Sequence, residues 1–319
     1  METLVEARNI RKYFIARKRM FKEPEYVKAV DGVSLKIFGG SVTALVGESG
    51  SGKTTLGRIL AGVLKPTSGE VLFKGRDIYR DGLDRESRHA IQMIFQNPDS
   101  SLNPRMRIID ILGEAIKEID PNISKEGLVD KASKLLEEVN LHTDHLYKYP
   151  HELSGGEKQR VAIARAIAVN PDFIVADEPV SALDISIRAQ IINLLSRIQR
   201  EKNITILYIA HDLRTVWNLS DYIAVMYLGK IVEFGETEEV FKNTAHPYTA
   251  TLLSTAPLLP RELRRDYLEP RGEPPSLINP PRGCRFHTRC PLKRDECTEI
   301  PMELEDIGDG HLTACPFYR

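Results

Sequence analysis

The sequence predicts an α/β fold with a parallel sheet, an inserted helical subdomain and a small, irregular, cysteine-rich C-terminal appendage. Short apolar runs alternate with stretches of helical spacing, which is typical of parallel strands covered on both faces. This alternation stops between residues 97 and 150, where helical patterns take over. Prolines become dense after about Asn243, and all four cysteines lie beyond residue 283, so an irregular appendage is expected there.

These patterns locate the expected elements. Four apolar runs are the predicted strands, at residues 42–46, 173–176, 204–209 and 222–226. A helix is predicted from about Lys53 to Val63, because apolar residues recur on one face and Gly62 stands near its end. Within the insertion, the helical patterns cover residues 108–119 and 129–139.

Length and composition limit the class of protein. At 319 residues the chain exceeds a usual single core. We therefore expect domains at 1–245 and 246–319, with the helical subdomain at about 97–165. A hydrophobic content of 42%, a charged content of 28% and a net charge of −1 are those of an ordinary soluble protein and do not indicate nucleic-acid binding. No run approaches the roughly 18 apolar residues of a membrane span, and no leader is evident, so a cytosolic location is expected.

Residues 47–54 form a glycine-rich loop between a predicted strand and a predicted helix. Small residues there let backbone N–H groups close around phosphate oxygens as the helix begins. Lys53 would reach the β- and γ-phosphates, and the Thr54 hydroxyl would ligate Mg²⁺. An ordinary glycine-rich turn is the alternative. The expected nucleotide-binding residues of this segment are Gly47, Ser49, Gly50, Ser51, Gly52, Lys53, Thr54 and Thr55.

Polar side chains follow the later strands, where an open α/β sheet places its ligand chemistry. Asp177 suits a water on Mg²⁺, and Glu178 suits general-base activation of the attacking water. His211 follows another strand and would face the γ-phosphate. Gln96 stands where the insertion begins, and its amide can contact both Mg²⁺ and water. On position alone, structural roles for His211 and Gln96 are equally good interpretations.

Residues 153–160 read Leu-Ser-Gly-Gly-Glu-Lys-Gln-Arg and open a predicted helix. Ser154, Gly155 and Gly156 would present N–H groups and the positive end of the helix dipole outward. The chain's own phosphate loop does not need these groups, so an anion held by a partner molecule is the expected ligand. A simple helix cap is the alternative.

The order of these motifs, together with Ser181-Ala182-Leu183-Asp184, resembles the P-loop ATPase core of the ATP-binding-cassette nucleotide-binding subunits of membrane transporters. The resemblance covers roughly residues 4 to 255. It implies a head-to-tail pair of cassettes with ATP between the phosphate loop of one and the signature of the other. Asp184 would then lie at the dimer seam, and Gln96 would couple the site to a membrane subunit. Phe14, with Tyr13 as a substitute, would stack on adenine.

The tail narrows the resemblance to the oligopeptide and dipeptide importer type, since His246-Pro247-Tyr248-Thr249 resembles the C-terminal extension of those cassettes. The expected function is ATP hydrolysis that drives peptide import at the cytoplasmic face of the cell membrane. The implied partners are a second homologous ATPase subunit, two membrane permease subunits and, indirectly, an extracytoplasmic solute-binding protein. A homodimer stays open, as does import of oligosaccharides or nickel complexes.

Two other function classes fit less well. A soluble nucleic-acid-associated cassette protein would carry a long coiled coil or tandem cassettes, and the sequence has neither. A metabolic P-loop kinase would have no use for residues 153–160.

The four cysteines, Cys284, Cys290, Cys297 and Cys315, can supply four thiolates to a soft metal. Two of them precede proline, as in ferredoxin-type loops, which favours a [4Fe–4S] cluster. The paired spacing of zinc sites is absent, so zinc is the second choice and no metal the third. The nearby basic residues are interpreted as a solvated face or a partner contact, and they are Arg282, Arg285, Arg289, Lys293 and Arg294.

Overall fold

The computed structural model describes residues 2–17, 24–181, 183–256, 260, 263 and 268–318. Ala182 and most of residues 257–267, which belong to the predicted irregular appendage, lie outside these residues. The contacts divide the chain into a first unit of residues 1–82 and 207–319 and a second unit of residues 83–206. The predicted domain boundary at residue 245 stays a prediction.

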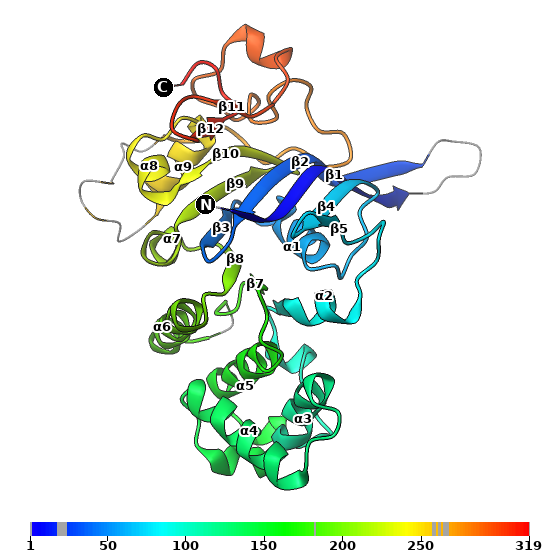
Figure 1. Cartoon of the computed structure of the whole chain (residues 1–319). Coiled ribbons are helices and arrows are strands. Elements are labelled where there is room, and N and C mark those ends of the chain that lie inside the picture. Colours follow the sequence, from blue (N-terminus) through cyan, green and yellow to red (C-terminus); the bar gives the residue numbers. More distant parts are fainter. Residues whose placement is uncertain are drawn as a thin grey trace. The chain divides into compact units, whose positions relative to one another are not determined.

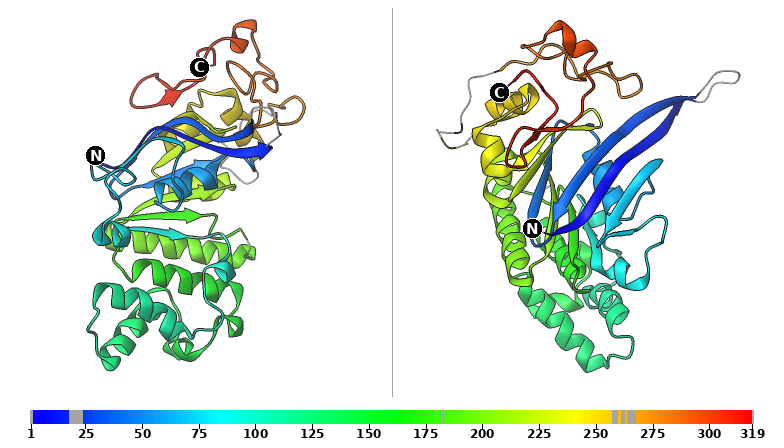
Figure 2. Two further views of the ribbon diagram at one scale, coloured as in Figure 1. Left: turned by 90° about the vertical axis from the view of Figure 1, so that its right-hand side faces the viewer. Right: turned by 45° about the horizontal axis from the view of Figure 1, so that its top comes forward.

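The first unit contains an antiparallel sheet that the sequence did not predict. Its strand order is β2-β1-β4-β5, with bounds β1 Thr3–Arg17, β2 Glu25–Phe38, β4 Ser68–Phe73 and β5 Arg76–Asp77. The long strands β1 and β2 run side by side (Figure 2). Val5 and Ile10 of β1 are buried while Arg8 and Asn9 between them are exposed. Interrupted burial of this kind leaves no continuous apolar run, which is the pattern that predicted the other strands.

The other sheet of the first unit is mixed. Its order is β11-β12-β10-β9-β3-β8, with bounds β3 Val42–Val46, β8 Thr205–Ala210, β9 Tyr222–Tyr227, β10 Lys230–Glu236, β11 Glu305–Asp306 and β12 Leu312–Thr313. The pairing of β3 with β9 is parallel, as predicted, whereas β10 and the strands beyond it are antiparallel. The cysteine-rich appendage therefore supplies β11 and β12 to a sheet.

Four helices belong to the first unit, among the residues that the structure describes: α1 Lys53–Leu60, α7 Leu213–Leu219, α8 Thr237–Lys242 and α9 Pro247–Thr255, with a 3₁₀ turn at Asp295–Thr298. The prediction that the first helix reaches Val63 was wrong. Gly62 takes a left-handed φ of 72°, and the N–H of Val63 donates to the Arg58 carbonyl at 2.9 Å. This closing turn satisfies the last carbonyls of α1 and ends the helix.

The second unit is mostly helical and includes the predicted insertion. Helices α3, α4 and α5 pack together (Figure 1) around buried Leu112, Leu136 and Ile163. The parallel strands β6 and β7 pair with Met93 opposite Val175. The bounds are α2 Arg85–Ala90, β6 Ile91–Ile94, α3 Ile108–Ile119, α4 Lys125–Glu138, α5 Gly155–Ile167, β7 Phe173–Asp177 and α6 Ile185–Lys202, with 3₁₀ turns at Pro98–Ser100, Thr143–Tyr147 and Pro150–Glu152.

Helix α4 begins four residues before the predicted start at residue 129. Ser124 caps it, since its hydroxyl accepts a hydrogen bond from the N–H of Gly127 at 3.0 Å. Helix α3 and the four predicted strands are confirmed to within one residue at each end. In the described part of the chain, no helix combines the length and apolar character that a membrane crossing requires.

Candidate functional site

The glycine-rich loop connects β3 to α1 in the first unit and depends on two close backbone approaches. Gly47 and Gly52 have positive φ angles of 152° and 109°. A Cβ on Gly47 would lie 2.1 Å from the Met226 carbonyl oxygen, and a Cβ on Gly52 would lie 2.1 Å from that of Ala29. Only glycine allows β9 and β2 to support the loop at these distances.

The loop is suited to an anion. Lys53 is buried, and its Nζ donates to the carbonyls of Gly47 at 2.8 Å and Glu48 at 3.0 Å. The buried Ser51 hydroxyl has no hydrogen-bond partner. Because a buried polar atom is costly to leave unpaired, an oxygen-rich ligand fits the loop. The first N–H groups of α1 begin at the same place. These features fit the phosphates of ATP.

His211 lies beside the loop, and its role at the γ-phosphate stays a prediction. It lines a pocket of about 140 Å³ together with Gly47, and residues of α9 such as Leu252 complete the lining. The part that the helix after His246 plays in this pocket could not be predicted from any local motif.

The expected catalytic residues of the second unit lie together. Gln96 Nε2 donates to Glu178 Oε2 at 3.0 Å and to the Ser181 hydroxyl at 3.3 Å. Asp177 is buried at the end of β7. Glu178 has a φ of 48°, a conformation that non-glycine residues seldom adopt and that is common at functional sites. The structure thus brings Gln96 and Glu178 into direct contact.

The predicted signature begins α5 with a capping box. The Ser154 hydroxyl accepts from the N–H of Glu157 at 3.4 Å, and the Ser154 N–H donates to Glu157 Oε2 at 2.8 Å. The hydrogen bond from the Ser154 hydroxyl, followed by that from its backbone, lowers the pKa of Glu157 to about 2. The carboxylate therefore stays ionised and holds the helix start in place.

Helix α6 begins beside the signature. A Cβ on Gly156 would lie 2.7 Å from Ile187 Cγ2, and one on Gly155 would lie 3.3 Å from Leu183 Cδ2. Asp184 is the N-cap residue of α6 and makes no side-chain capping hydrogen bond. Its carboxylate can therefore stabilise α6 only through the helix dipole.

Tyr13 and Phe14 are distinguished by their surroundings on β1. The Tyr13 hydroxyl donates to Asp31, and burial together with this hydrogen bond raises the pKa of Tyr13 to about 12. Phe14 is 40% exposed, with Lys12 Nζ 5.3 Å from its ring centroid. Of these two candidates, Phe14 thus has the more open ring, and its stacking on adenine stays a prediction.

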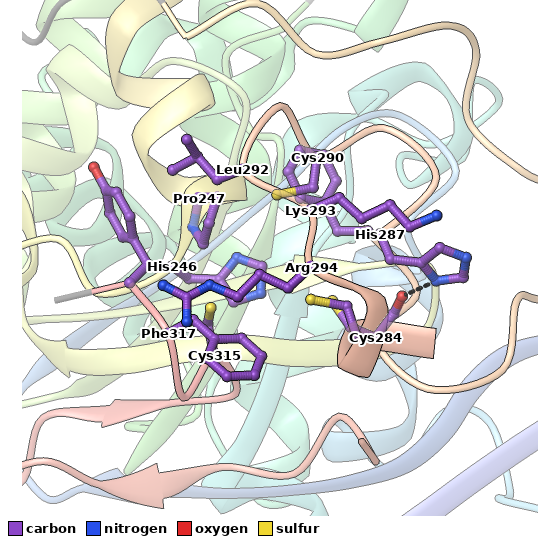
Figure 3. Close-up of a pocket in the computed structure, with 13 residues that line it drawn as sticks. His246, Pro247, Cys284, His287, Cys290, Leu292, Lys293, Arg294, Cys315 and Phe317 are labelled. Carbon is purple, nitrogen blue, oxygen red and sulfur yellow. Dashed lines mark hydrogen bonds between the residues drawn. The ribbon is translucent and has the colours of Figure 1, made fainter. Parts of the chain in front are cut away.

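The four cysteines line one cavity of about 380 Å³, along with His246, Pro247 and Phe286 (Figure 3). Burial, and to a lesser degree the neighbouring cysteines, raise the pKa of Cys284 to about 12 and that of Cys290 to about 11. His246 is fully buried, and its Nε2 has no hydrogen-bond partner. Within the described ranges, no three His, Cys, Asp or Glu side chains converge closely enough to hold one metal ion. The expected iron–sulfur cluster is not confirmed by this geometry and stays a prediction.

The prediction of a solvated basic face was wrong for two of its members. Arg285 and Arg289 are buried, and they pair with Asp31 and Glu48 respectively. These partners lie more than two hundred residues earlier in the chain. No local signal in the sequence could have identified them.

Comparisons with known proteins agree with this geometry. Residues 30–181 match the model of the ABC transporter family, and residues 232–297 match that of the oligopeptide/dipeptide transporter C-terminal region. The chain is 45% identical to the oligopeptide transport ATP-binding protein AppF of Bacillus subtilis (strain 168), over 99% of this chain and 98% of that relative. It is 43% identical to the dipeptide transport ATP-binding protein DppF of Escherichia coli (strain K12), over 98% of this chain and 94% of that relative.

A solved structure shares the fold. It is the dimeric, post-hydrolysis state of the ATP-binding cassette MJ0796 bound to ADP and Pi, which is 29% identical with a TM-score of 0.64. The match covers 73% of this chain and 98% of that one.

Proposed function

Because the chain belongs to the ABC transporter family, as an ATP-binding subunit of the oligopeptide and dipeptide type, we propose that it hydrolyses ATP to drive peptide import. The observation that carries this proposal is the likeness to peptide-transport ATP-binding proteins across 98–99% of the chain, C-terminal region included. Neither a lone phosphate loop nor the fold would distinguish an importer subunit from other ATPases.

The ATP chemistry follows from the residues already described. Lys53 and the loop N–H groups bind the phosphates, and Phe14 stacks on the base. Thr54 and Gln96 would hold Mg²⁺, and Asp177 would accept from a water bound to it; the ion would supply positive charge that neutralises the phosphates. Glu178 accepts the proton of the attacking water, and its hydrogen bond from Gln96 orients the carboxylate. His211 positions the γ-phosphate.

The signature acts on a second molecule. Ser154, Gly155 and Gly156 present the N-terminus of α5, which is suited to an anion. We assign this surface to the ATP held by a partner cassette, with Asp184 at the seam between the two. A second, homologous ATPase subunit is the proposed partner. Two permease subunits and a solute-binding protein complete the proposed importer, so the chain would act as a peripheral protein at the cytoplasmic face of the membrane.

Reconstitution tests this proposal. The chain is combined in vesicles with its second ATPase subunit and the two permease subunits, and ATP turnover is measured with and without peptide-loaded binding protein. We expect turnover to rise with the complete system. If an oligosaccharide-loaded or nickel-loaded binding protein stimulates turnover and a peptide-loaded one does not, the cargo is an oligosaccharide or a nickel complex. Tight, salt-dependent binding of RNA or DNA would contradict the importer function altogether.

The proposed function includes a [4Fe–4S] cluster held by Cys284, Cys290, Cys297 and Cys315. The shared cavity supports it, as does the unpaired Nε2 of His246 that lines the same cavity. In a [4Fe–4S] cluster each thiolate binds a different iron, so its ligands lie further apart than around one zinc ion. The cavity shared by the four thiols is the observation that supports the cluster, and zinc is the alternative.

Metal content decides between these assignments. Anaerobic purification should give a brown protein that absorbs near 400 nm, with about four iron atoms per chain. A Cys297→Ser variant should lose most of the colour, whereas a Ser276→Ala variant in the same extension should keep it. A colourless wild-type protein that contains zinc would show that the cysteines bind zinc and not an iron–sulfur cluster.

A further inference from the structure

We propose that two arginines of the C-terminal extension position the ATP site. Arg289 acts through Glu48 at the phosphate end, and Arg285 acts through Asp31 at the base end. This inference rests on the proposed function, because it concerns the same phosphate loop. All the residues involved lie in the first unit.

At the phosphate end, one residue of the loop is held twice by the extension. Arg289 Nη1 donates to both carboxylate oxygens of Glu48, at 3.0 and 2.9 Å. The N–H of Glu48 donates to the Tyr248 hydroxyl at 2.8 Å. Glu48 lies directly after Gly47, and its carbonyl accepts from Lys53 Nζ. Fixing Glu48 therefore fixes the loop and a carbonyl that holds the phosphate-binding lysine.

The Arg289 contact is well protected from water. The Arg289 side chain is 8% exposed and that of Glu48 is 30% exposed. A charge-assisted pair in such a position is shielded less by salt than a surface pair. Removal of Glu48 would leave the buried guanidinium without its counter-charge, so neither partner is readily replaced.

At the base end, a second ion pair reaches the strand that carries Phe14. Arg285 donates to Asp31 and to the Leu228 carbonyl. Asp31 also accepts a hydrogen bond from the Tyr13 hydroxyl on β1. Since Tyr13 precedes Phe14, this chain of contacts fixes the backbone from which the stacking ring projects. The Arg285 and Asp31 side chains are 6% and 14% exposed.

The two arginines are held in a fixed relation by the compact turn between them. The N–H groups of Arg289 and Cys290 both donate to the Phe286 carbonyl, at 2.9 and 2.8 Å. The N–H of Cys284 donates to the Cys297 carbonyl at 2.9 Å. Arg285 follows Cys284, and Arg289 precedes Cys290. A displacement of the cysteine-lined turn would therefore move both arginines together.

Nucleotide affinity tests the proposal. Binding of ADP with Mg²⁺ to the full chain is measured by calorimetry, since ADP is not hydrolysed, and pyrophosphate with Mg²⁺ serves as a probe without a base. We expect Arg289→Ala to weaken both ligands by about tenfold or more, in the range of ordinary coupling between sites. Arg285→Ala should weaken ADP and leave pyrophosphate unchanged. Arg282→Ala, at an exposed arginine of the same segment, should change neither.

Further variants separate positioning from general stability. If Arg289 acts through Glu48, the Glu48→Gln/Arg289→Ala double variant should lose no more affinity than Arg289→Ala alone. Arg289→Lys should restore part of the affinity, because lysine keeps the charge but not the planar guanidinium whose Nη1 reaches both carboxylate oxygens. A purely structural role would lower the melting temperature but leave the affinity of the folded variants for ADP and for pyrophosphate unchanged. Should Arg289→Ala fail to fold, Glu48→Gln probes the same contact from its more exposed side.

The outcomes are distinct. A folded Arg289→Ala or Glu48→Gln variant that binds ADP as the wild type does would overturn the proposal, and so would losses that add fully in the double variant. A wild-type chain that binds neither ADP nor ATP would contradict the proposed function itself.

Discussion

Single residues decide whether the phosphate loop can form at all. Gly52 and Gly50 both have positive φ angles, 109° and 77°, yet their surroundings differ. A Cβ on Gly52 would meet the Ala29 carbonyl oxygen at 2.1 Å, whereas a Cβ on Gly50 would have no heavy atom within 4 Å. The first position is limited by sterics and the second by backbone conformation only.

Gly52→Ala is therefore expected to abolish ADP binding and lower stability, because the backbone of β2 cannot yield to the added carbon. Gly50→Ala should still fold and lose only about 1–2 kcal/mol for the left-handed conformation. Calorimetric ADP titration and urea denaturation of both variants measure this difference. Equal ADP affinity in the Gly52→Ala variant and the wild type would show that the loop is not the nucleotide site.

Glu178 is the residue on which turnover depends. Glu178→Gln keeps the shape of the side chain but removes the general base, so kcat should fall by roughly 10²–10⁴-fold while ATP affinity changes little. Steady-state phosphate release and equilibrium ATP binding give the two numbers. Glu201→Gln, at an exposed acid of α6, is the matched control. Undiminished hydrolysis would remove Glu178 from the mechanism.

Among the elements, α5 carries the signature and begins with a capping box. Ser154 and Glu157 cap each other, and His145 Nε2 lies 3.1 Å from Glu157 Oε1. Asp184 at the start of α6 makes no comparable capping hydrogen bond. The two helix starts therefore differ in what their N-cap side chains contribute to stability.

Ser154→Ala should cost about 1 kcal/mol of unfolding free energy, and Asp184→Ala should cost less, as urea denaturation would measure. Equal losses would mean that the capping box does not stabilise α5.

The same box predicts a pH dependence. The folded-state pKa of Glu157 is lowered from 4.5 to about 2, so its contribution to stability is complete above pH 4.5 and is lost as the pH falls toward 2. In Glu157→Gln this component should be missing. Urea midpoints between pH 5 and 3 should then fall less steeply for the variant than for the wild type. Parallel curves would contradict the role of the capping box.

For the whole molecule, the central expectation is that ATP is enclosed by two chains. With ATP and Mg²⁺, Glu178→Gln should trap the dimer, because hydrolysis no longer releases it. Light scattering should report a doubled mass for the homodimer, or for the heterodimer when the second ATPase subunit is supplied. Ser154→Ala combined with Glu178→Gln should weaken this assembly. Monomers under all these conditions, with the permease subunits present, would contradict the shared site.

Much of the fold and site could be predicted because the determining interactions are local. Continuous apolar runs marked the strands at residues 42–46 and 173–176, and spacing marked the helix at 108–119. The phosphate loop was recognisable because its glycines are required by backbone geometry. Gln96 and Glu178 were both selected, although their hydrogen bond could not be foreseen since they lie 82 residues apart.

The sequence alone therefore determined the motifs, whose chemistry is contained in a few adjacent residues. The tertiary structure decided which distant strands and side chains support these motifs. Strands β1 and β2 were hidden because half-buried strands mix charged and apolar residues. Arg285 and Arg289 read as surface charges, but each is buried against a carboxylate 254 or 241 residues away. A buried charge is stable only beside an opposite charge, and only folding brings residues so far apart in the sequence together.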